Sequence, residues 1–173
     1  MKKNVYGIAY NLGISYLNCI KYDPSFAVMF DIDDTLLYSK NFKGIKPIIN
    51  LLNECNKRNF KVIIITARDS IYTEDTIQDL LNIGIYPNQD NLYNSNYYDY
   101  IYLRHSPKDN HNLFKSDIKK KLYDNGIQTI MSIGDNEVDI NGNYSGYAIK
   151  LPNTKDPRLF HKNNLGQMVN VKV

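Results

Sequence analysis

The stretch "FDIDDTLLYSK" (residues 30–40) places three aspartates within four positions, directly after an apolar run. That run, "SFAVMF" (25–30), contains no charged residue and predicts a buried strand. Like charges crowded at the end of a buried strand repel one another unless a cation or a ligand offsets the repulsion. We therefore expect this strand end to form part of a binding or catalytic site.

Two of these acids, Asp31 and Asp33, suit a shared chemical task. Side chains two positions apart on an extended segment point to the same face. Mg²⁺ is commonly held by one or two carboxylates together with waters and substrate phosphate, so the pair predicts a magnesium site. One carboxylate could attack phosphorus, and a second could transfer protons. Asp34 is expected to be solvated or to cap a turn.

Continuous apolar runs alternate with helical patterns along the rest of the chain. The patterns predict strands at 25–30, 60–66, 100–104, 127–134 and 147–151, and helices at 46–59, 73–84 and 110–126. Strands without polar interruption are typical of parallel sheets that helices cover on both faces. The predicted fold class is therefore α/β, a three-layer Rossmann-like domain. Most of 85–112 is expected to be loop, and residues 153–173 a C-terminal tail.

Polar residues follow three of the predicted strands. They are Asp31 and Asp33, then Thr66 and Arg68, and finally Asp135 and Asp139. The carboxyl ends of parallel strands lie at one edge of the sheet, where such folds bind their ligands. We therefore expect these side chains to meet at one site. Arg104 and His105, which follow the predicted strand 100–104, are further candidates for its lining.

The order of these motifs resembles that of the haloacid-dehalogenase (HAD) superfamily of phosphohydrolases. "DIDDT" (31–35) is similar to the DxDxT motif of that superfamily, and "GDNEVD" (134–139) is similar to its fourth motif. Between them, Thr66 in "IIIITAR" resembles the second motif and Lys115 in "NLFKSDIKKKL" the third. "KLPN" (150–153) further resembles the ending of acid phosphatases of the plant and bacterial class C kind. The resemblance covers roughly residues 5 to 155.

The resemblance implies a role for each matched acid. Asp31 would be the nucleophile, forming an aspartyl-phosphate, and also a magnesium ligand. Asp33 would be the general acid and base, with its main-chain carbonyl on the metal. Asp135 would be a magnesium ligand. Asp139 would support the site, either through a water on the metal or by holding Lys115.

The remaining matched residues would bind the phosphoryl group of the substrate. Thr66 would hydrogen-bond it together with Ala67 and Arg68, although Arg68 is equally suited to capping a helix. Lys115 would neutralise charge on the nucleophile and the phosphoryl group. Lys108 and the three lysines at 119–121 compete with Lys115 for this role, but we expect the three consecutive lysines to form a solvated helix face.

The motifs also indicate the type of reaction. In this superfamily an acid/base at the position of Asp33 goes with phosphatases. About thirty residues separate Thr35 from Thr66, room for a loop and one helix but not for a cap domain. We expect no cap or a minimal one, and a magnesium-dependent phosphomonoesterase. Its open site would accept a phosphorylated small molecule, a nucleotide or a macromolecular phosphate ester.

Two other functions are weighed against this one. The first is a nucleic-acid end phosphatase that acts on polynucleotide 3′-phosphates, although the net charge of +3 is too small to argue for nucleic acid. The second is a catalytically silent HAD-fold binding protein, which the complete acid/base set disfavours. A calcium loop is excluded because Leu36 and Phe42 stand where such a loop needs Gly and Glu.

Length and cysteine content complete the expectations. The 173 residues predict one HAD-like phosphatase domain over 1–173, with an amphipathic helix within 1–22 packed on it. Two cysteines without a CxxC motif favour a reducing, cytoplasmic compartment. The start faintly resembles a signal peptide, so export is the alternative, but asparagines interrupt it. No apolar run is long enough to span a membrane, and we expect no membrane partner.

Overall fold

The computed structural model describes residues 4–89, 96–105, 110 and 112–172. Its centre is a seven-stranded sheet in the order β5–β2–β1–β6–β7–β8–β9. The parallel strands are β1 (Phe26–Phe30), β2 (Lys61–Asp69), β5 (Tyr100–Arg104), β6 (Gln128–Gly134) and β7 (Tyr147–Lys150). Two short strands, β8 (Phe160–Lys162) and β9 (Met168–Asn170), extend the sheet in antiparallel orientation. This mostly parallel sheet confirms the predicted α/β class.

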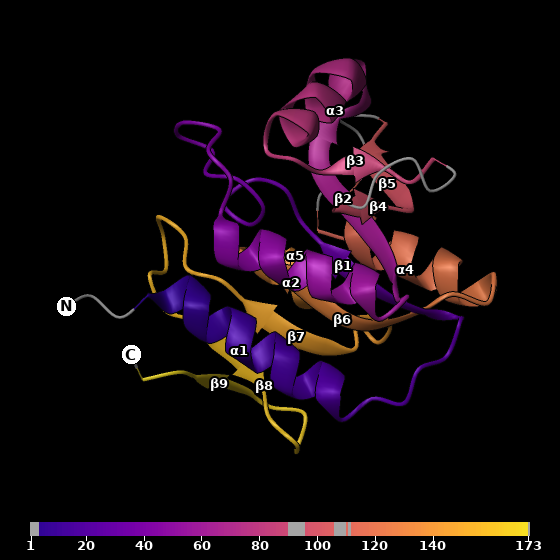
Figure 1. Ribbon diagram of the computed structural model, residues 1–173. Helices are drawn as coiled ribbons and strands as arrows, with labels where there is room; N and C mark the ends of the chain where they lie inside the picture. Colours follow the sequence, from indigo (N-terminus) through magenta and orange to yellow (C-terminus); the bar gives the residue numbers. More distant parts are fainter. Residues whose placement is uncertain (1–3, 90–95, 106–109, 111, 173) are drawn as a thin grey trace.

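Helices cover both faces of the sheet. α1 (Val5–Asn18) and α2 (Lys46–Lys57) lie on one face, and α4 (Phe114–Asp124) and α5 (Glu137–Ile140) on the other (Figure 1). The alternation along β1 explains this arrangement, because successive side chains of a strand point to opposite faces. Val28 and Phe30 belong to the apolar cluster that includes α1 and α2, whereas Ala27 and Met29 pack in the cluster that includes Leu122 of α4.

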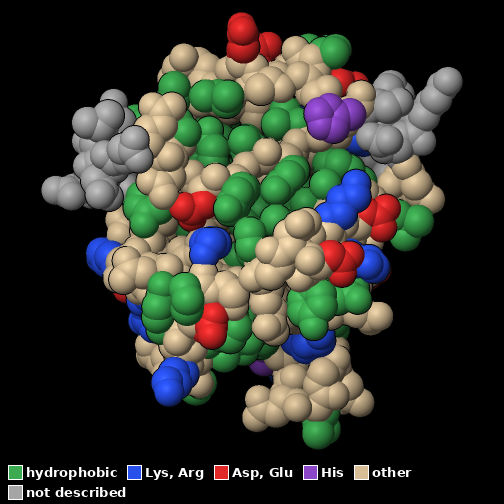
Figure 2. Space-filling model, turned by 90° about the vertical axis from the view of Figure 1, so that its right-hand side faces the viewer, with side chains coloured by type: hydrophobic (Ala, Val, Ile, Leu, Met, Phe, Trp, Pro, Cys, Tyr) green, Lys and Arg blue, Asp and Glu red, His purple; other side chains and the backbone are tan. Residues whose placement is uncertain are grey.

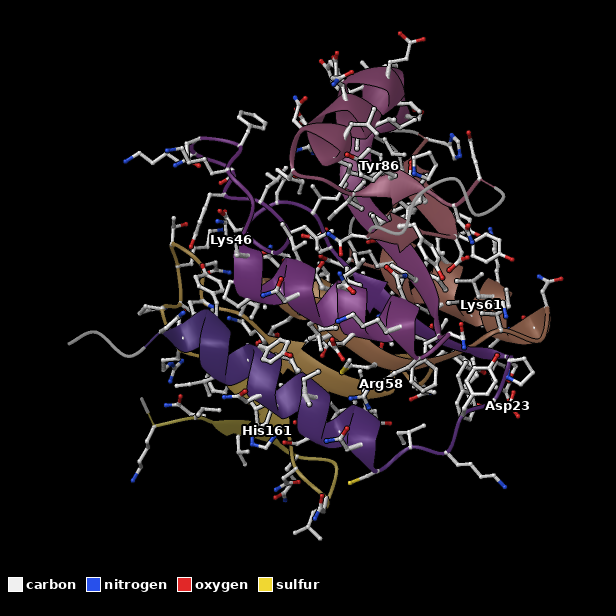
Figure 3. The ribbon with its side chains drawn as sticks, in the orientation of Figure 1. Asp23, Lys46, Arg58, Lys61, Tyr86 and His161 are labelled. Atoms are coloured by element: carbon white, nitrogen blue, oxygen red, sulfur yellow. The ribbon has the colours of Figure 1, made fainter. Side chains whose placement is uncertain are left out.

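The strand order places a switch point between β1 and β6. The chain leaves β1 through α2 to reach β2 on one side, whereas β6 is the neighbour of β1 on the other side. Ligands in open α/β sheets bind outside the carboxyl ends of the strands at such a point. The opposite, amino edge is marked by Asp23 and Lys61, which precede β1 and begin β2 (Figure 3).

A small excursion follows β2. It consists of the 3-10 helix η1 (Ser70–Tyr72), α3 (Thr73–Asn82) and a two-stranded pair, β3 (Tyr86–Pro87) with β4 (Tyr97–Tyr98). Between Thr35 and Thr66, in contrast, the chain forms the single helix α2. Pro47 lies in the first turn of this helix, as expected. The small size of the excursion after β2 and the single helix between Thr35 and Thr66 agree with a domain that has no cap or a minimal one.

The structure departs from the sequence-based expectations in four segments. The helix expected at 110–126 is α4, which begins only at Phe114. β2 continues to Asp69, because a register shift lets Asp69 pair with Arg104 of β5. The interval 85–112, expected mostly as loop, also contains β3 and β4. Residues 153–173, expected as a tail, contain β8 and β9, which are too short to show a periodic pattern.

Cys19 is exposed and Cys55 is buried, and both are free thiols. Within the described residues, no helix is both long and apolar enough to cross a membrane.

Candidate active site

A cavity of about 480 Å³ lies at the carboxyl edge of the sheet, where β1, β2 and β6 end. Its volume is in the range of small-molecule sites. The residues that line it are Asp31, Asp33, Asp34, Thr66, Ala67, Asn112, Lys115, Asp135, Asn136, Glu137, Val138 and Asp139. The structure thus brings together most of the predicted site residues, whereas Arg68, Arg104 and His105 are not among the lining residues.

Asp31 is fixed at the end of β1 by both its main chain and its side chain. Its N–H donates to the carbonyl of Ile133 in β6 at 3.0 Å, which holds the two strand ends together. Its carboxylate is buried and accepts a hydrogen bond from Lys115 Nζ at 2.5 Å. The side chain therefore has one orientation, toward the cavity.

Lys115 bridges two carboxylates in the interior. Besides Asp31, its ammonium donates to Asp139 Oδ1 at 2.6 Å, and only 3 % of its side chain is exposed. Burial alone would lower the pKa of Lys115, but the two carboxylates outweigh it and raise that pKa. The second oxygen of Asp139 accepts from the N–H of Asn136 at 2.9 Å. The contact with Lys115 is one of the two supporting roles considered for Asp139.

Asp135 follows β6 and is held by two asparagines that the sequence analysis did not single out as site residues. Asn136 Nδ2 donates to Asp135 Oδ1 at 2.8 Å, and Asn153 Nδ2 donates to the main-chain carbonyl of Asp135 at 2.7 Å. Asn153 is the last residue of "KLPN" (150–153), so that motif ties the segment after β7 to the site. The "KLPN" motif was therefore a visible signal in the sequence, but the contact of Asn153 with Asp135 could not be predicted from it.

The crowded acids hold their protons more tightly than isolated carboxyls do. Burial, reinforced by the charge of Asp139, raises the pKa of Asp31 to about 8 although Lys115 opposes the shift. Burial and the same neighbour raise the pKa of Asp135 to about 6. Oxygens of Asp31, Asp135 and Asp139 lie within 4.8 Å of one another. A hard divalent cation fits this arrangement, because oxygen ligands suit it and its charge would relieve the repulsion.

Asp33 lies nearer the solvent and is paired with Arg68. The guanidinium donates from Nε to one carboxylate oxygen at 2.9 Å and from Nη2 to the other at 2.8 Å. Arg68 Nη1 also donates to Asp79 of α3 at 2.7 Å. Arg68 was expected to bind substrate phosphate or to cap a helix. In the structure it binds the two acids and does not line the cavity.

The end of β2 supplies the polar groups opposite these acids. Thr66 is buried, and its hydroxyl accepts from the N–H of Arg68 at 3.2 Å, which leaves the hydroxyl proton available to a ligand. Ala67 lines the cavity beside it. A phosphoryl group in the cavity would therefore find a hydroxyl donor on one side and the Lys115 ammonium on the other.

We expect residues 119–121 to form a solvated helix face, but for Lys119 this prediction is wrong. Lys119 is fully buried, one helical turn after Lys115, and burial lowers its pKa to about 7. Its ammonium donates to Ser145 Oγ at 2.6 Å and to the main-chain carbonyl of Asp139 at 2.7 Å. Lys119 therefore anchors the backbone of the segment that carries Asp139. The spacing of four from Lys115, which puts both on one helix face, is the signal that could have found it.

The further candidates from the sequence lie elsewhere. These candidates, Arg104 and His105, are not among the residues that line the cavity. The described tyrosines of 86–102 do not line it either: Tyr98 is buried, and Tyr100 is 38 % exposed on β5. Figure 2 views the molecule from the side on which β5 and α4 lie, and apolar side chains gather in the middle of that face.

Comparison with known proteins decides the family. The model of the HAD superfamily, subfamily IIIB (Acid phosphatase), matches residues 38–156. The chain belongs to this family. The matched range of the subfamily IIIB model includes Thr66, Lys115, Asp135 and Asp139, and Asp31 and Asp33 lie just before it. No curated protein matches the sequence.

Solved structures share the fold of this subfamily IIIB chain. The class C acid phosphatase from Bacillus anthracis matches with a TM-score of 0.62 and 18 % identity. A structure of that phosphatase with tungstate bound matches with a TM-score of 0.61 and 17 % identity. Each match covers 80 % of this chain but 64 % of the other, so this chain spans about 64 % of the length of these relatives.

Gly134 is required by the close approach of Asp139. A Cβ at position 134 would overlap the Cβ and the carboxyl group of Asp139. We expect Gly134→Ala to lower the free energy of unfolding by about 1–3 kcal/mol or more, measured by urea denaturation. Gly7→Ala in α1 is the matched control, because its Cβ would meet Asn4 at an ordinary 3.4 Å and alanine favours a helix. Equal stability of Gly134→Ala and the wild type would contradict this packing.

The raised pKa values predict how cation binding depends on pH. Between pH 4 and 8 the metal-free folded state binds more protons at Asp31 and Asp135 than the unfolded chain does, because both pKa values lie above the ordinary 3.8. The contribution of these groups to stability is therefore present at low pH and is lost as the pH rises through about 6 to 8. A divalent cation that binds these carboxylates must displace the same protons, so its stabilising effect should grow from pH 5 to pH 8.

Thermal unfolding with and without Mg²⁺ measures this effect. At a concentration a hundredfold above Kd, binding at pH 8 should stabilise the protein by about 2.7 kcal/mol, or about 5–10 °C in Tm. At pH 5 the shift should be much smaller, and Asp135→Asn should remove most of it at pH 8. A shift that is the same at both pH values, or that survives in Asp135→Asn, would argue against this cation site.

Proposed function

We propose that the protein is a magnesium-dependent phosphomonoesterase that works through an aspartyl-phosphate on Asp31. The observation that carries this proposal is the buried Lys115, paired with both Asp31 and Asp139 at the base of an open cavity. Membership of an acid phosphatase family supports the same reaction class. Phosphoryl transfer depends on positioning and on charge stabilisation, and this site provides cationic, hydroxyl and carboxylate groups around one space.

In this proposal the substrate phosphoryl group binds between β2 and α4. The hydroxyl of Thr66 and the main-chain N–H of Ala67 donate to its oxygens, and Lys115 offsets their charge. Asp31, Asp135 and the main-chain carbonyl of Asp33 would hold the magnesium ion. The bound ion would neutralise charge that develops on the phosphoryl oxygens.

The first chemical step forms a bond between a carboxylate oxygen of Asp31 and phosphorus. The ester P–O bond breaks, and the leaving oxygen takes a proton from Asp33 and departs as an alcohol. In the second step a water molecule gives a proton to Asp33 and attacks phosphorus. The acyl-phosphate bond breaks, which releases inorganic phosphate and restores the Asp31 carboxylate and the protonated Asp33.

In this scheme Arg68 restricts proton transfer by Asp33, because it binds both carboxylate oxygens at which a proton could be held. The bidentate pair occupies both oxygens of the Asp33 carboxylate. A protonated carboxyl has one acceptor fewer, so Asp33 must weaken this pair before it can donate a proton. Asp79 supplies a second carboxylate to the same guanidinium and can keep Arg68 in place while Asp33 changes state.

The cavity favours phosphorylated small molecules as a class of substrate. It is open to solvent at the carboxyl edge, and its volume of about 480 Å³ admits a phosphorylated small molecule or a nucleotide. The acids around it disfavour further negative charge beside the phosphoryl group. We therefore place phosphomonoesters of small molecules before macromolecular phosphates.

Replacement of the nucleophile tests the mechanism directly. Asp31→Asn should lower the rate of para-nitrophenyl phosphate hydrolysis at least about a thousandfold, because an amide cannot form the acyl phosphate. Removal of divalent cations with EDTA should also abolish turnover, and Mg²⁺ should restore it. Asp23→Asn, at the amino edge of the sheet, is the control and should retain full activity (Figure 3). More than a tenth of wild-type activity in Asp31→Asn would refute the proposed nucleophile.

The proposed acid role of Asp33 predicts a dependence on the leaving group. An alkoxide needs a proton to depart, whereas para-nitrophenolate is stable without one. In Asp33→Asn, kcat/KM for an alkyl phosphate should therefore fall about a hundredfold further than kcat/KM for para-nitrophenyl phosphate. If both substrates lose activity equally, Asp33 does not protonate the leaving group.

A further inference from the structure

A second cavity, of about 340 Å³, lies against the same short helix as the active site. α5 contributes Val138 and Asp139 to the active-site cavity and Ile140 to the second one, and Glu137 borders both. The lining of the second cavity is completed by Asn141, Lys150, Asp156, Arg158, Phe160 and Met168. The two spaces are therefore neighbours that share one wall.

Lys150 is a buried cation in this second cavity. Only 6 % of the residue is exposed, at the end of β7. Its ammonium has three N–H donors, but the structure gives it a single long hydrogen bond, of 3.3 Å, to the carbonyl of Leu151. It also lies 5.6 Å from the centre of the Phe160 ring. Across the described residues, no carboxylate forms an ion pair with it, although burying an unpaired charge is costly.

No other charged group of the cavity forms an ion pair with Lys150. Asp156 is paired with Arg158 through two side-chain hydrogen bonds, of 2.8 and 2.9 Å. These bonds lower the pKa of Asp156 to about 2, and the more distant charge of Lys150 adds a smaller part. Arg158 also lies over the Phe160 ring, 4.9 Å from its centre. Glu137 is exposed where the two cavities meet. Lys150 is thus the one buried charge among the described residues that line the second cavity, and it lies beside the apolar side chains of Ile140, Phe160 and Met168.

We propose that the second cavity binds a second anionic group of the substrate, which Lys150 recognises. This inference rests on the proposed function, because it assumes that the phosphoryl group of the same substrate occupies the neighbouring site. The substrate class is then a phosphate ester with an apolar middle and a distal carboxylate or phosphate. The substrate would pass around α5 where Glu137 borders both cavities, so the two charges would be at least one helix diameter, about 10 Å, apart.

Alkyl phosphates of a single chain length, longer than about 10 Å, test this subsite. They differ only at the far end, which is a methyl group, a carboxylate or a second phosphate. The wild type should bind both anionic forms with a KM about tenfold or more below that of the methyl form, since hydrogen bonds to charged groups are strong. Comparison of KM for the carboxylate-ended and the phosphate-ended substrate shows which anion the cavity prefers.

Lys150→Met should remove this discrimination and leave kcat and KM for the methyl-ended substrate within twofold. Lys155→Met, which removes an exposed lysine outside the cavity, is the matched control. It should change neither the discrimination between substrates nor the kinetics of the methyl-ended substrate. Met168→Glu provides a second variant with little risk to folding, because Met168 is 39 % exposed at the cavity. Its new charge should raise KM for the anionic substrates alone, whereas Met168→Gln should not.

Binding of an alkyl carboxylate, which has no phosphate to hydrolyse, separates the two proposals. Calorimetry should show about tenfold weaker binding to Lys150→Met than to the wild type. If no ester is hydrolysed but this difference is found, the subsite stands and the phosphatase proposal fails. The subsite is overturned if the esters are hydrolysed without any discrimination that depends on Lys150. It is also overturned if Lys150→Met changes KM equally for the methyl-, carboxylate- and phosphate-ended esters.

Discussion

The ammonium of Lys115, buried between the carboxylates of Asp31 and Asp139, is the interaction on which the rest of the site depends. Breaking a buried pair leaves an uncompensated charge, which costs several kcal/mol, so the three side chains form one unit. Through Asp31 this unit is tied to β1, through Lys115 to α4 and through Asp139 to α5. Three elements that are far apart in the sequence thus acquire one fixed relative position at the switch point of the sheet.

The surroundings of this unit keep it in place. Gly134 lets the Asp139 side chain lie directly on the end of β6, and Lys119 holds the Asp139 carbonyl from within the core. Asn153 fixes the main chain at Asp135 from the far side. Preorganised groups are what phosphoryl transfer requires, because they need not reorganise as charge moves. The rigidity of the site is therefore a property of packing, and the acids alone would repel one another.

The sequence predicted the parallel sheet and the residues at its carboxyl edge, because both depend on local patterns. Apolar runs reveal buried strands, and Asp31, Thr66 and Asp135 directly follow such runs. The role of Lys119 was missed, because burial of one lysine in a row of three depends on what α4 packs against. The pairing of Arg68 with Asp33 was missed for a similar reason, since Asp79, which completes it, comes from α3. β8 and β9, of three residues each, carry too few side chains to show a period.

The way in which the sheet ends has a consequence for the behaviour of the protein in concentrated solution. An edge strand offers unpaired N–H and C=O groups to any passing extended chain, and long flat edges promote aggregation. Here the parallel core stops at β7, and the sheet tapers through β8 into β9, which runs only from Met168 to Asn170. The template open to another chain on this side is three residues long. A strongly apolar parallel sheet is thereby shielded, along that edge, from joining its own copies into fibrils.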